Sequence, residues 1–234
     1  LAKILKEIAA KTKPDVKAQE LNRLAESLIL KSGGEPAFKG YSSKDDKNPF
    51  PSALCVSINE EVVHGIPTDR KTKEGDLVKL DLGLKYKGFF TDTAVTMGVG
   101  KISKEAKRLS NITKEALGLG IHEVRAGARI GDISYAIQKH LNKNHIGIVR
   151  SLAGHGVGLE VHEEPLIPNY GQKETGPELI EGMVLAIEVM TTLGNGKIKL
   201  ADDGWTYKSA DDTLGAHFEH TVIVTKKGAE ILTQ

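Results

Sequence analysis

EGDLVKLDLGLKYKGFFTDTAVT, residues 74–96, is the stretch that decides the fold. Two apolar and β-branched runs flank a short turn-forming segment, and this pattern predicts a β-hairpin. Asp81 and Asp92 lie in its two arms. A loop at residues 86–87 places them directly opposite each other, and a loop at residues 87–88 makes them diagonal neighbours. Both registers put the two carboxylates on one face, within about 8 Å of each other. The other face then carries Leu80, Leu82 and Leu84.

A similar block recurs in the second half of the chain. EGDLVKLD at residues 74–81 resembles EGMVLAIE at residues 181–188, and in each an acid falls six residues after the glycine. Later in each half an acid precedes a β-branched run, at Asp92 and at Glu219. Helical patterns precede the first block and separate the two. The sequence therefore predicts two related α+β halves, each of which gives two carboxylates to a shared centre.

Hydrophobic spacing indicates four helices. The first spans residues 1–12, and we expect a short segment to precede it because the pattern is already helical at residue 1. Asp15, Ser103 and Asp132 are the predicted N-cap residues of the other three. Residues 39–51 are polar, rich in turn formers, and predicted to form a loop.

The bulk composition is that of an ordinary globular protein. The chain has 234 residues, 39% hydrophobic and 27% charged, with a net charge of +1. This balance gives no sign of nucleic-acid or membrane-surface binding. No apolar run approaches the roughly 20 residues of a membrane span. The single cysteine, Cys55, excludes an internal disulfide and fits a reducing, cytoplasmic compartment.

Carboxylates inside strand-like stretches are costly unless something pairs with them. Four such acids and one histidine between glycines form a plausible ligand set for two divalent cations: Asp81, Asp92, His155, Glu188 and Glu219. Oxygen and nitrogen donors together suit Mn, Fe, Co or Zn better than Ca. Two such ions about 3.5–4 Å apart can activate water and polarise a carbonyl group. The set therefore suggests hydrolysis at a two-metal centre.

Read in order, the motifs resemble those of the type I methionine aminopeptidases. They are CVSIN at residues 55–59, VHGIP at 63–67, Asp81, Asp92, GHGVG at 154–158, HEEP at 162–165, Glu188 and FEHT at 218–221. The resemblance implies the α+β pita-bread fold, in which two pseudo-symmetric halves surround a dinuclear metal centre. It also implies one peptidase M24-like catalytic domain over residues 1–234. Only 32 residues separate His155 from Glu188, too few for the large insertion of the type II enzymes.

The same resemblance implies roles for the five donors. Asp81 would chelate one metal ion, and Asp92 and Glu219 would bridge both ions. His155 and Glu188 would complete the shell of the second ion. Glu188 would also carry a proton to the leaving amine.

Further residues follow from the resemblance alone. His64 and His162 would contact the substrate and stabilise the tetrahedral intermediate. A soft apolar pocket for methionine would be formed by Phe38, Tyr41, Phe50, Cys55 and Trp205. Two positions depart from the pattern. Val161 stands where some relatives carry Phe, and His217 replaces a common Gln.

The resemblance implies a monomeric, cytoplasmic enzyme that removes N-terminal methionine from nascent polypeptides when the second residue is small. Docking to the ribosome would be expected with it, without nucleic-acid binding of the enzyme's own and without a membrane. Two alternatives remain open at this point. One is a proline-specific aminopeptidase or prolidase of the same fold. The other is a binding protein that keeps the fold without catalysis.

Overall fold

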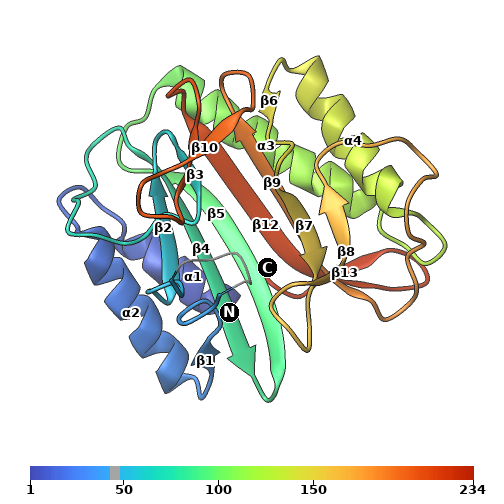
Figure 1. The fold of residues 1–234 in the computed structure, drawn as a ribbon, viewed down its shortest axis with the longest axis horizontal. Coiled ribbons are helices and arrows are strands. Elements are labelled where there is room, and N and C mark those ends of the chain that lie inside the picture. Colours follow the sequence, from blue (N-terminus) through green and yellow to red (C-terminus); the bar gives the residue numbers. More distant parts are fainter. Residues whose placement is uncertain (43–47) are drawn as a thin grey trace.

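The computed structural model describes residues 1–42 and 48–234, and in these the chain forms a large antiparallel sheet backed by helices (Figure 1). The main path of the sheet is β1 (Glu35–Pro36), β4 (Leu77–Tyr86), β5 (Phe89–Gly98), β12 (Gly215–Val224), β9 (Val184–Thr192), β7 (Ala153–Gly156) and β8 (Glu163–Pro168). Three further strands pair with β4, β9 and β12: β2 (Leu54–Ile58), β6 (Gly147–Ile148) and β13 (Ala229–Ile231). A small sheet contains β10 (Ile198–Leu200), β11 (Tyr207–Ser209) and β3 (Glu61–Val63).

The predicted hairpin is present as β4 and β5. Its loop consists of Lys87 and Gly88, whose φ angles of 52° and 88° are both positive. Two positive φ values in a two-residue loop match the right-handed twist of the flanking strands. The register pairs Asp81 with Ala94, two residues beyond Asp92. The two acids are therefore diagonal neighbours on one face, as the second of the two predicted registers requires.

The two predicted halves are also present. Helices α1 (Ala2–Lys11) and α2 (Ala18–Lys31) precede the β4–β5 pair. Helices α3 (Lys104–His122) and α4 (Ile130–Lys143) precede the β9–β12 pair. The halves join where β5 pairs antiparallel with β12, so the four long strands lie side by side at the centre of the sheet (Figure 1).

Strand alternation separates the core from the site. Apolar side chains of the four long strands pack against the helices in two clusters of buried residues. These include Leu80 and Leu82 on β4, Ile187 on β9, and Phe218 and Val222 on β12. The acids occupy the intervening positions, and successive side chains of a strand point to opposite faces. All four carboxylates therefore lie on the sheet face away from the helices.

The helix starts were predicted with mixed success. Ser103 caps α3, because its Oγ accepts a hydrogen bond from the Ala106 backbone N–H at 3.0 Å. Asp15 is not a cap, and that prediction is wrong: α2 begins three residues later, after Lys17. The first amides of α2, at Ala18 and Gln19, instead donate to backbone carbonyls of the segment at residues 68–70. A partner distant in sequence thus replaces the side-chain cap.

The start of α4 was also misplaced. The helix begins at Ile130, so Asp132 is its third residue rather than its N-cap. The Asp132 carboxylate reaches back to accept a hydrogen bond from the Arg129 N–H at 2.8 Å, and it accepts another from the Glu174 N–H at 2.9 Å. Asp132 therefore stabilises the helix start from the third position, as the acid of a capping box does.

We expect Asp132→Ala to lower the free energy of unfolding by about 1–2 kcal/mol at pH 7, because two hydrogen bonds are lost. Although slight burial acts in the opposite direction, these two bonds hold the pKa of the Asp132 carboxyl below its usual value. The stabilisation is therefore present above the unfolded-state pKa and is lost as the pH falls through the folded-state pKa. Urea unfolding of the metal-free proteins should show the difference at pH 7 and its disappearance near pH 2. A constant difference at both pH values would contradict this role.

The predicted loop at residues 39–51 is only partly described. Residues 39–42 and 48–51 contain no helix or strand, and residues 43–47 lie outside the described part of the chain. The two described arms meet through backbone hydrogen bonds, since Gly40 N–H donates to Phe50 C=O at 2.8 Å and Phe50 N–H donates to Tyr41 C=O at 2.7 Å. These bonds bring Tyr41 and Phe50 together over the face that carries the acids.

Candidate metal centre

Strand registers align the five predicted donors. Glu219 on β12 is opposite Ala94 on β5 and opposite Glu188 on β9, while Ala94 is opposite Asp81 on β4. Residues directly opposite in an antiparallel pair point to the same face. One row across four strands therefore carries three carboxylates, and Asp92 adds a fourth two residues along β5.

His155 joins this row from β7. It is opposite Ala186, two residues before Glu188, so its ring lies on the same face. Its Nδ1 is 2.9 Å from the Gly156 carbonyl oxygen, which leaves Nε2 directed at the acids. A bond to the outer ring nitrogen is the usual way in which a metal-binding histidine is oriented. The flanking glycines are required by space, because a Cβ at Gly154 would lie 2.5 Å from the Ala186 carbonyl oxygen.

The donor atoms converge closely enough to share a cation. One ligand atom each from Asp92, His155 and Glu219 lie within 4.8 Å of one another, and all three residues are buried. Glu188 Oε1 lies 3.9 Å from His155 Nε2. The Oδ1 atoms of Asp81 and Asp92 are buried and have no hydrogen-bond partner among the described residues. A cation would satisfy these oxygens, so the residues present fit a metal centre.

The electrostatics of the metal-free site support the same conclusion. Burial, and then the charges of Asp92 and Glu188, raise the pKa of Asp81 well above its usual value. The pKa of Glu219 is raised in the same way, by burial and then by the charges of Asp92, Glu188 and Asp81. Burial also raises the pKa of Asp92 to about 6, against the opposing effect of His155. Without cations these acids repel one another, and opposite charge would remove that penalty.

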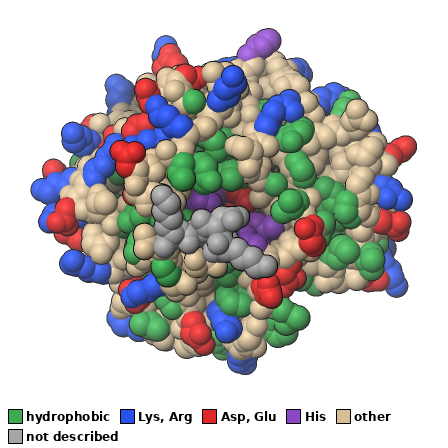
Figure 2. Space-filling model, in the orientation of Figure 1, with side chains coloured by type: hydrophobic (Ala, Val, Ile, Leu, Met, Phe, Trp, Pro, Cys, Tyr) green, Lys and Arg blue, Asp and Glu red, His purple; other side chains and the backbone are tan. Residues whose placement is uncertain are grey.

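Beside the donors lies a cavity of about 60 Å³. All five predicted pocket residues line it, namely Phe38, Tyr41, Phe50, Cys55 and Trp205. Phe50 and Trp205 meet edge to face at 5.3 Å, and the Trp205 indole N–H donates to the Asn48 carbonyl at 3.1 Å. Figure 2 shows histidine and acidic side chains in the hollow of this face, with hydrophobic side chains around it. The space therefore has a polar end and an aromatic end.

Cys55 belongs to the wall of this cavity. It lies on β2 directly opposite Asp81 and is buried. Burial, and then the charges of Asp81 and other nearby acids, raises the pKa of its thiol well above the usual value. The side chain is therefore a neutral thiol that offers a soft, polarizable surface.

The two predicted substrate-contacting histidines also line the cavity. His162 Nδ1 is 2.8 Å from the Tyr41 hydroxyl, and its ring meets that of His155 at 4.4 Å. Desolvation of the His162 ring, and then the positive potential of His155, lower the pKa of His162 to about 4. The ring is neutral at pH 7. His64 has a positive φ of 58° and packs edge to face against Tyr207 at 5.8 Å and Trp205 at 6.5 Å.

Comparison with known proteins identifies the family. A model of metallopeptidase family M24 matches residues 1–226. The chain belongs to this family.

Relatives within M24 match this chain over nearly its whole length. It is 43% identical to a methionine aminopeptidase of Clostridium perfringens, covering 100% of this chain and 91% of the relative. It is 43% identical to methionine aminopeptidase 1 of Bacillus subtilis, over 97% of this chain and 90% of the relative. A crystal structure of methionine aminopeptidase from Thermotoga maritima superposes with a TM-score of 0.95 at 42% identity, covering 100% of this chain and 92% of that one. The resemblance drawn from the motifs is confirmed.

The architecture is also found in a more distant solved structure. Prolidase from Pyrococcus furiosus superposes with a TM-score of 0.76 at 23% identity, and this chain covers 60% of that protein. This likeness concerns the fold alone, and it confirms the predicted α+β pita-bread class.

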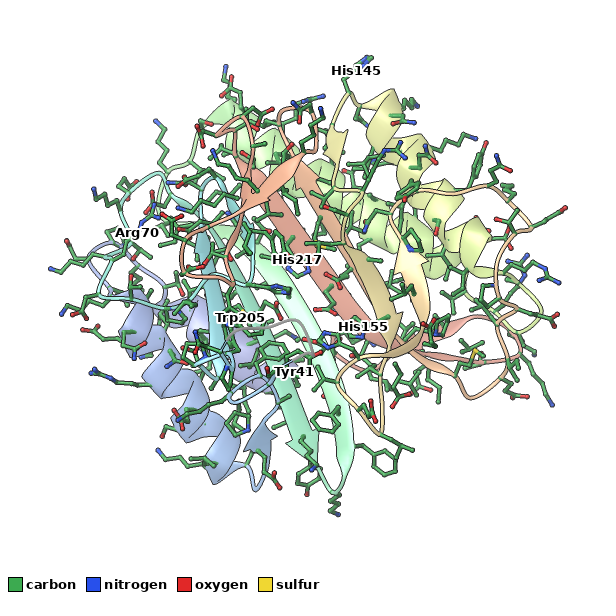
Figure 3. The ribbon with its side chains drawn as sticks, in the orientation of Figure 1. Tyr41, Arg70, His145, His155, Trp205 and His217 are labelled. Carbon is green, nitrogen blue, oxygen red and sulfur yellow. The ribbon has the colours of Figure 1, made fainter. Side chains whose placement is uncertain are left out.

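One residue of the site was not predicted. His217 on β12 is 2% exposed, lines the cavity, and lies two residues before Glu219 on the same face. Figure 3 shows it among His155, Trp205 and Tyr41, while Arg70 and His145 lie at the periphery. The available signal was strand alternation, since a polar residue two positions from a ligand on a buried strand shares that ligand's face.

Proposed function

We propose that this M24 metallopeptidase removes the N-terminal methionine from polypeptides whose second residue is small. The observation that carries the proposal is the junction of two environments in one cavity. Donors able to hold cations form one end, and a wall of aromatic rings and a neutral thiol forms the other. A peptide bond to be hydrolysed fits the first, and a thioether side chain fits the second. The identity of 43% to two methionine aminopeptidases supports the same conclusion.

The proposed ligands are Asp81, Asp92, His155, Glu188 and Glu219. We infer that Asp92 and Glu219 would bridge two divalent cations, because one ligand atom of each lies within 4.8 Å of the other and of a His155 ring nitrogen. Asp81 would belong to one cation, and His155 and Glu188 to the other. Carboxylate oxygen with one imidazole is compatible with Co, Mn, Fe or Zn.

When bound, the cations lower the pKa of a water molecule and polarise the scissile carbonyl. Glu188 is suited to move the proton. Burial raises the pKa of its carboxyl, but the hydrogen bond and charge of His217 outweigh this effect and leave that pKa below the usual value. The group is thus a carboxylate at neutral pH, which can accept a proton and pass it to the leaving amine.

His162 and His64 would bind the substrate. His162 uses Nδ1 for the Tyr41 hydroxyl, so Nε2 is the nitrogen left to hydrogen-bond the scissile peptide. His64 would contact the same peptide from the side of Trp205. Hydrogen-bond donors that meet the developing oxyanion stabilise the transition state.

We expect the protein loaded with Co(II) or Mn(II) to release methionine from Met-Gly-Met and to leave a peptide with a bulky second residue intact. A small cavity walled by aromatic rings favours the unbranched thioether chain, so Leu-Gly-Met should be cleaved at least about 10-fold less efficiently. Chromatographic measurement of the released amino acids gives the rate of cleavage of each peptide. Cleavage of Leu-Gly-Met or a Pro-containing N-terminus as fast as that of Met-Gly-Met would contradict methionine specificity.

The setting of the reaction is part of the proposal. We infer that residues 1–234 act as one catalytic domain and as a monomer in the cytoplasm, on polypeptides newly made at the ribosome. Within residues 1–42 and 48–234, none of the helices is both long and apolar enough to cross a bilayer. A near-neutral net charge of +1 gives no sign of nucleic-acid binding by the enzyme itself.

A further inference from the structure

His217 makes a polar contact that the five-ligand description does not use. Its Nε2 lies 3.1 Å from Glu188 Oε2, within hydrogen-bonding distance. Neither buried ring nitrogen makes a hydrogen bond of regular geometry among the described residues, and the Glu188 carboxylate is the polar group that faces Nε2. A buried polar ring normally has partners, because desolvation without them is costly. The Glu188 contact is therefore the interaction that accounts for the imidazole at this position.

The ring is held firmly from its backbone. Thr96 Oγ1 donates to the His217 carbonyl at 2.6 Å and accepts from the His217 N–H at 2.8 Å. Backbone pairing between β5 and β12 covers only the neighbouring residues Glu219 and His220. The Thr96 side chain continues the connection between the two halves of the sheet at this point. These two hydrogen bonds fix the backbone position from which the His217 side chain extends toward Glu188.

Glu188 divides its two oxygens between two histidines. Oε1 faces His155 Nε2 at 3.9 Å, and Oε2 faces His217 Nε2 at 3.1 Å. The Glu188 side chain is 14% exposed and has three rotatable bonds, so it has room to turn away if Oε2 is released. Partners that orient a ligating side chain typically contribute roughly 10- to 100-fold to metal affinity.

We propose that His217 is a positioning residue that fixes Glu188 through Oε2 and so presents Oε1 to the cation shared with His155. The inference rests on the proposed role of Glu188 as a ligand. His217 donates from Nε2–H, and a side-chain amide of similar reach supplies the same donor. The requirement is therefore for an N–H at this place and not for imidazole itself.

The test compares three variants of the full chain. His217→Leu fills the space without a donor, His217→Asn has a donor that is too short, and His217→Gln has one that reaches. Calorimetric titration of Mn(II) into metal-free protein should give an affinity roughly 10- to 100-fold weaker for the Leu and Asn variants. The Gln variant should regain most of the wild-type affinity. His122→Leu, at an exposed histidine in the last turn of α3, is the matched control and should bind as wild type.

Kinetics and metal-free stability add independent readouts. With saturating Mn(II), His217→Leu should lower kcat with little change in KM, because ground-state contacts to the peptide are untouched. In the presence of chelator, the urea midpoints of His217→Leu, Glu188→Leu and the double variant should be non-additive, since each single change removes the same contact. Additive midpoints would overturn the proposal.

The outcomes separate this inference from the ligand assignment. If Glu188→Gln weakens Mn(II) binding while His217→Leu binds as wild type, the positioning role is wrong and the assignment stands. If Glu188→Gln itself binds Mn(II) as wild type, the assignment fails. If His217→Gln is as weak as His217→Leu, imidazole is needed and His217 acts as a direct ligand, which also overturns the proposal.

Discussion

Replacing Glu219 with Gln is expected to abolish methionine release and to reduce bound metal, while the fold persists. Glu219 is 2% exposed and lies between Ala94 on β5 and Glu188 on β9, at the centre of the row of acids. A neutral amide cannot supply the charge that a bridging position needs. Loss of an outer partner alone costs up to roughly 100-fold, so loss of this ligand should cost more. Peptide-release kinetics and elemental analysis of the purified protein measure the two effects.

The same substitution should leave the metal-free protein at least as stable as wild type. Burial and the charges of neighbouring acids disfavour the ionised form of Glu219, so Gln removes an unfavourable charge from the cluster. Chelator-treated protein should show an equal or higher urea midpoint. Low activity combined with normal stability is the signature of a ligand, whereas low activity combined with unfolding is not.

The matched control is Glu230→Gln. Glu230 is an exposed acid on β13, the strand paired with β12 at Ile223, so the same chemical change is made outside the site. Activity and metal content should equal those of wild type. Asp92→Asn, the other proposed bridge, should behave like Glu219→Gln. Full turnover with normal metal content in either ligand variant would remove the bridging role.

Local rules predicted the hairpin and the faces of its residues. The parity of a two-residue loop placed Asp81 and Asp92 on one face, and the leucines between them on the other, before any distant contact was considered. The self-similar blocks likewise predicted that β9 and β12 would add two more acids. These features depend on sequence spacing alone, because the period of a strand is fixed by its geometry.

Contacts between segments that are distant in sequence could not be predicted from this local spacing. The start of α2 is satisfied by backbone carbonyls of residues 68–70, so Asp15 is not used as a cap. The contact of His217 with Glu188 depends on the register between β12 and β9, which joins strands separated by more than 20 residues. No local pattern specifies that register to the residue. The histidine was therefore visible as a departure from the family pattern, but its partner was not.

Cation binding is expected to stabilise the protein strongly, and more at pH 7.5 than at pH 5. In the metal-free fold, burial and mutual repulsion raise the pKa values of Asp81, Asp92 and Glu219 above those of the unfolded chain, that of Asp92 to about 6. The folded state therefore binds more protons than the unfolded state at intermediate pH. The stability of the metal-free protein must fall as the pH rises through the folded-state values. Bound cations offset that penalty where it is greatest, above pH 6.

Thermal unfolding with chelator, and with Mn(II) at 100 times its pH 7.5 Kd and the same concentration at pH 5, measures this difference. Binding at that ratio contributes about 2.7 kcal/mol, which corresponds to a rise in Tm of roughly 5–10 °C for a chain of this size. The metal-free protein should gain stability between pH 7.5 and pH 5, and Asp92→Asn should show a smaller gain because one of the titrating acids is gone. Both effects have one cause, the crowding of four acids on one sheet face. A metal-free protein whose Tm falls over this interval, or a Tm rise on Mn(II) addition that is equal at both pH values, would contradict that cause.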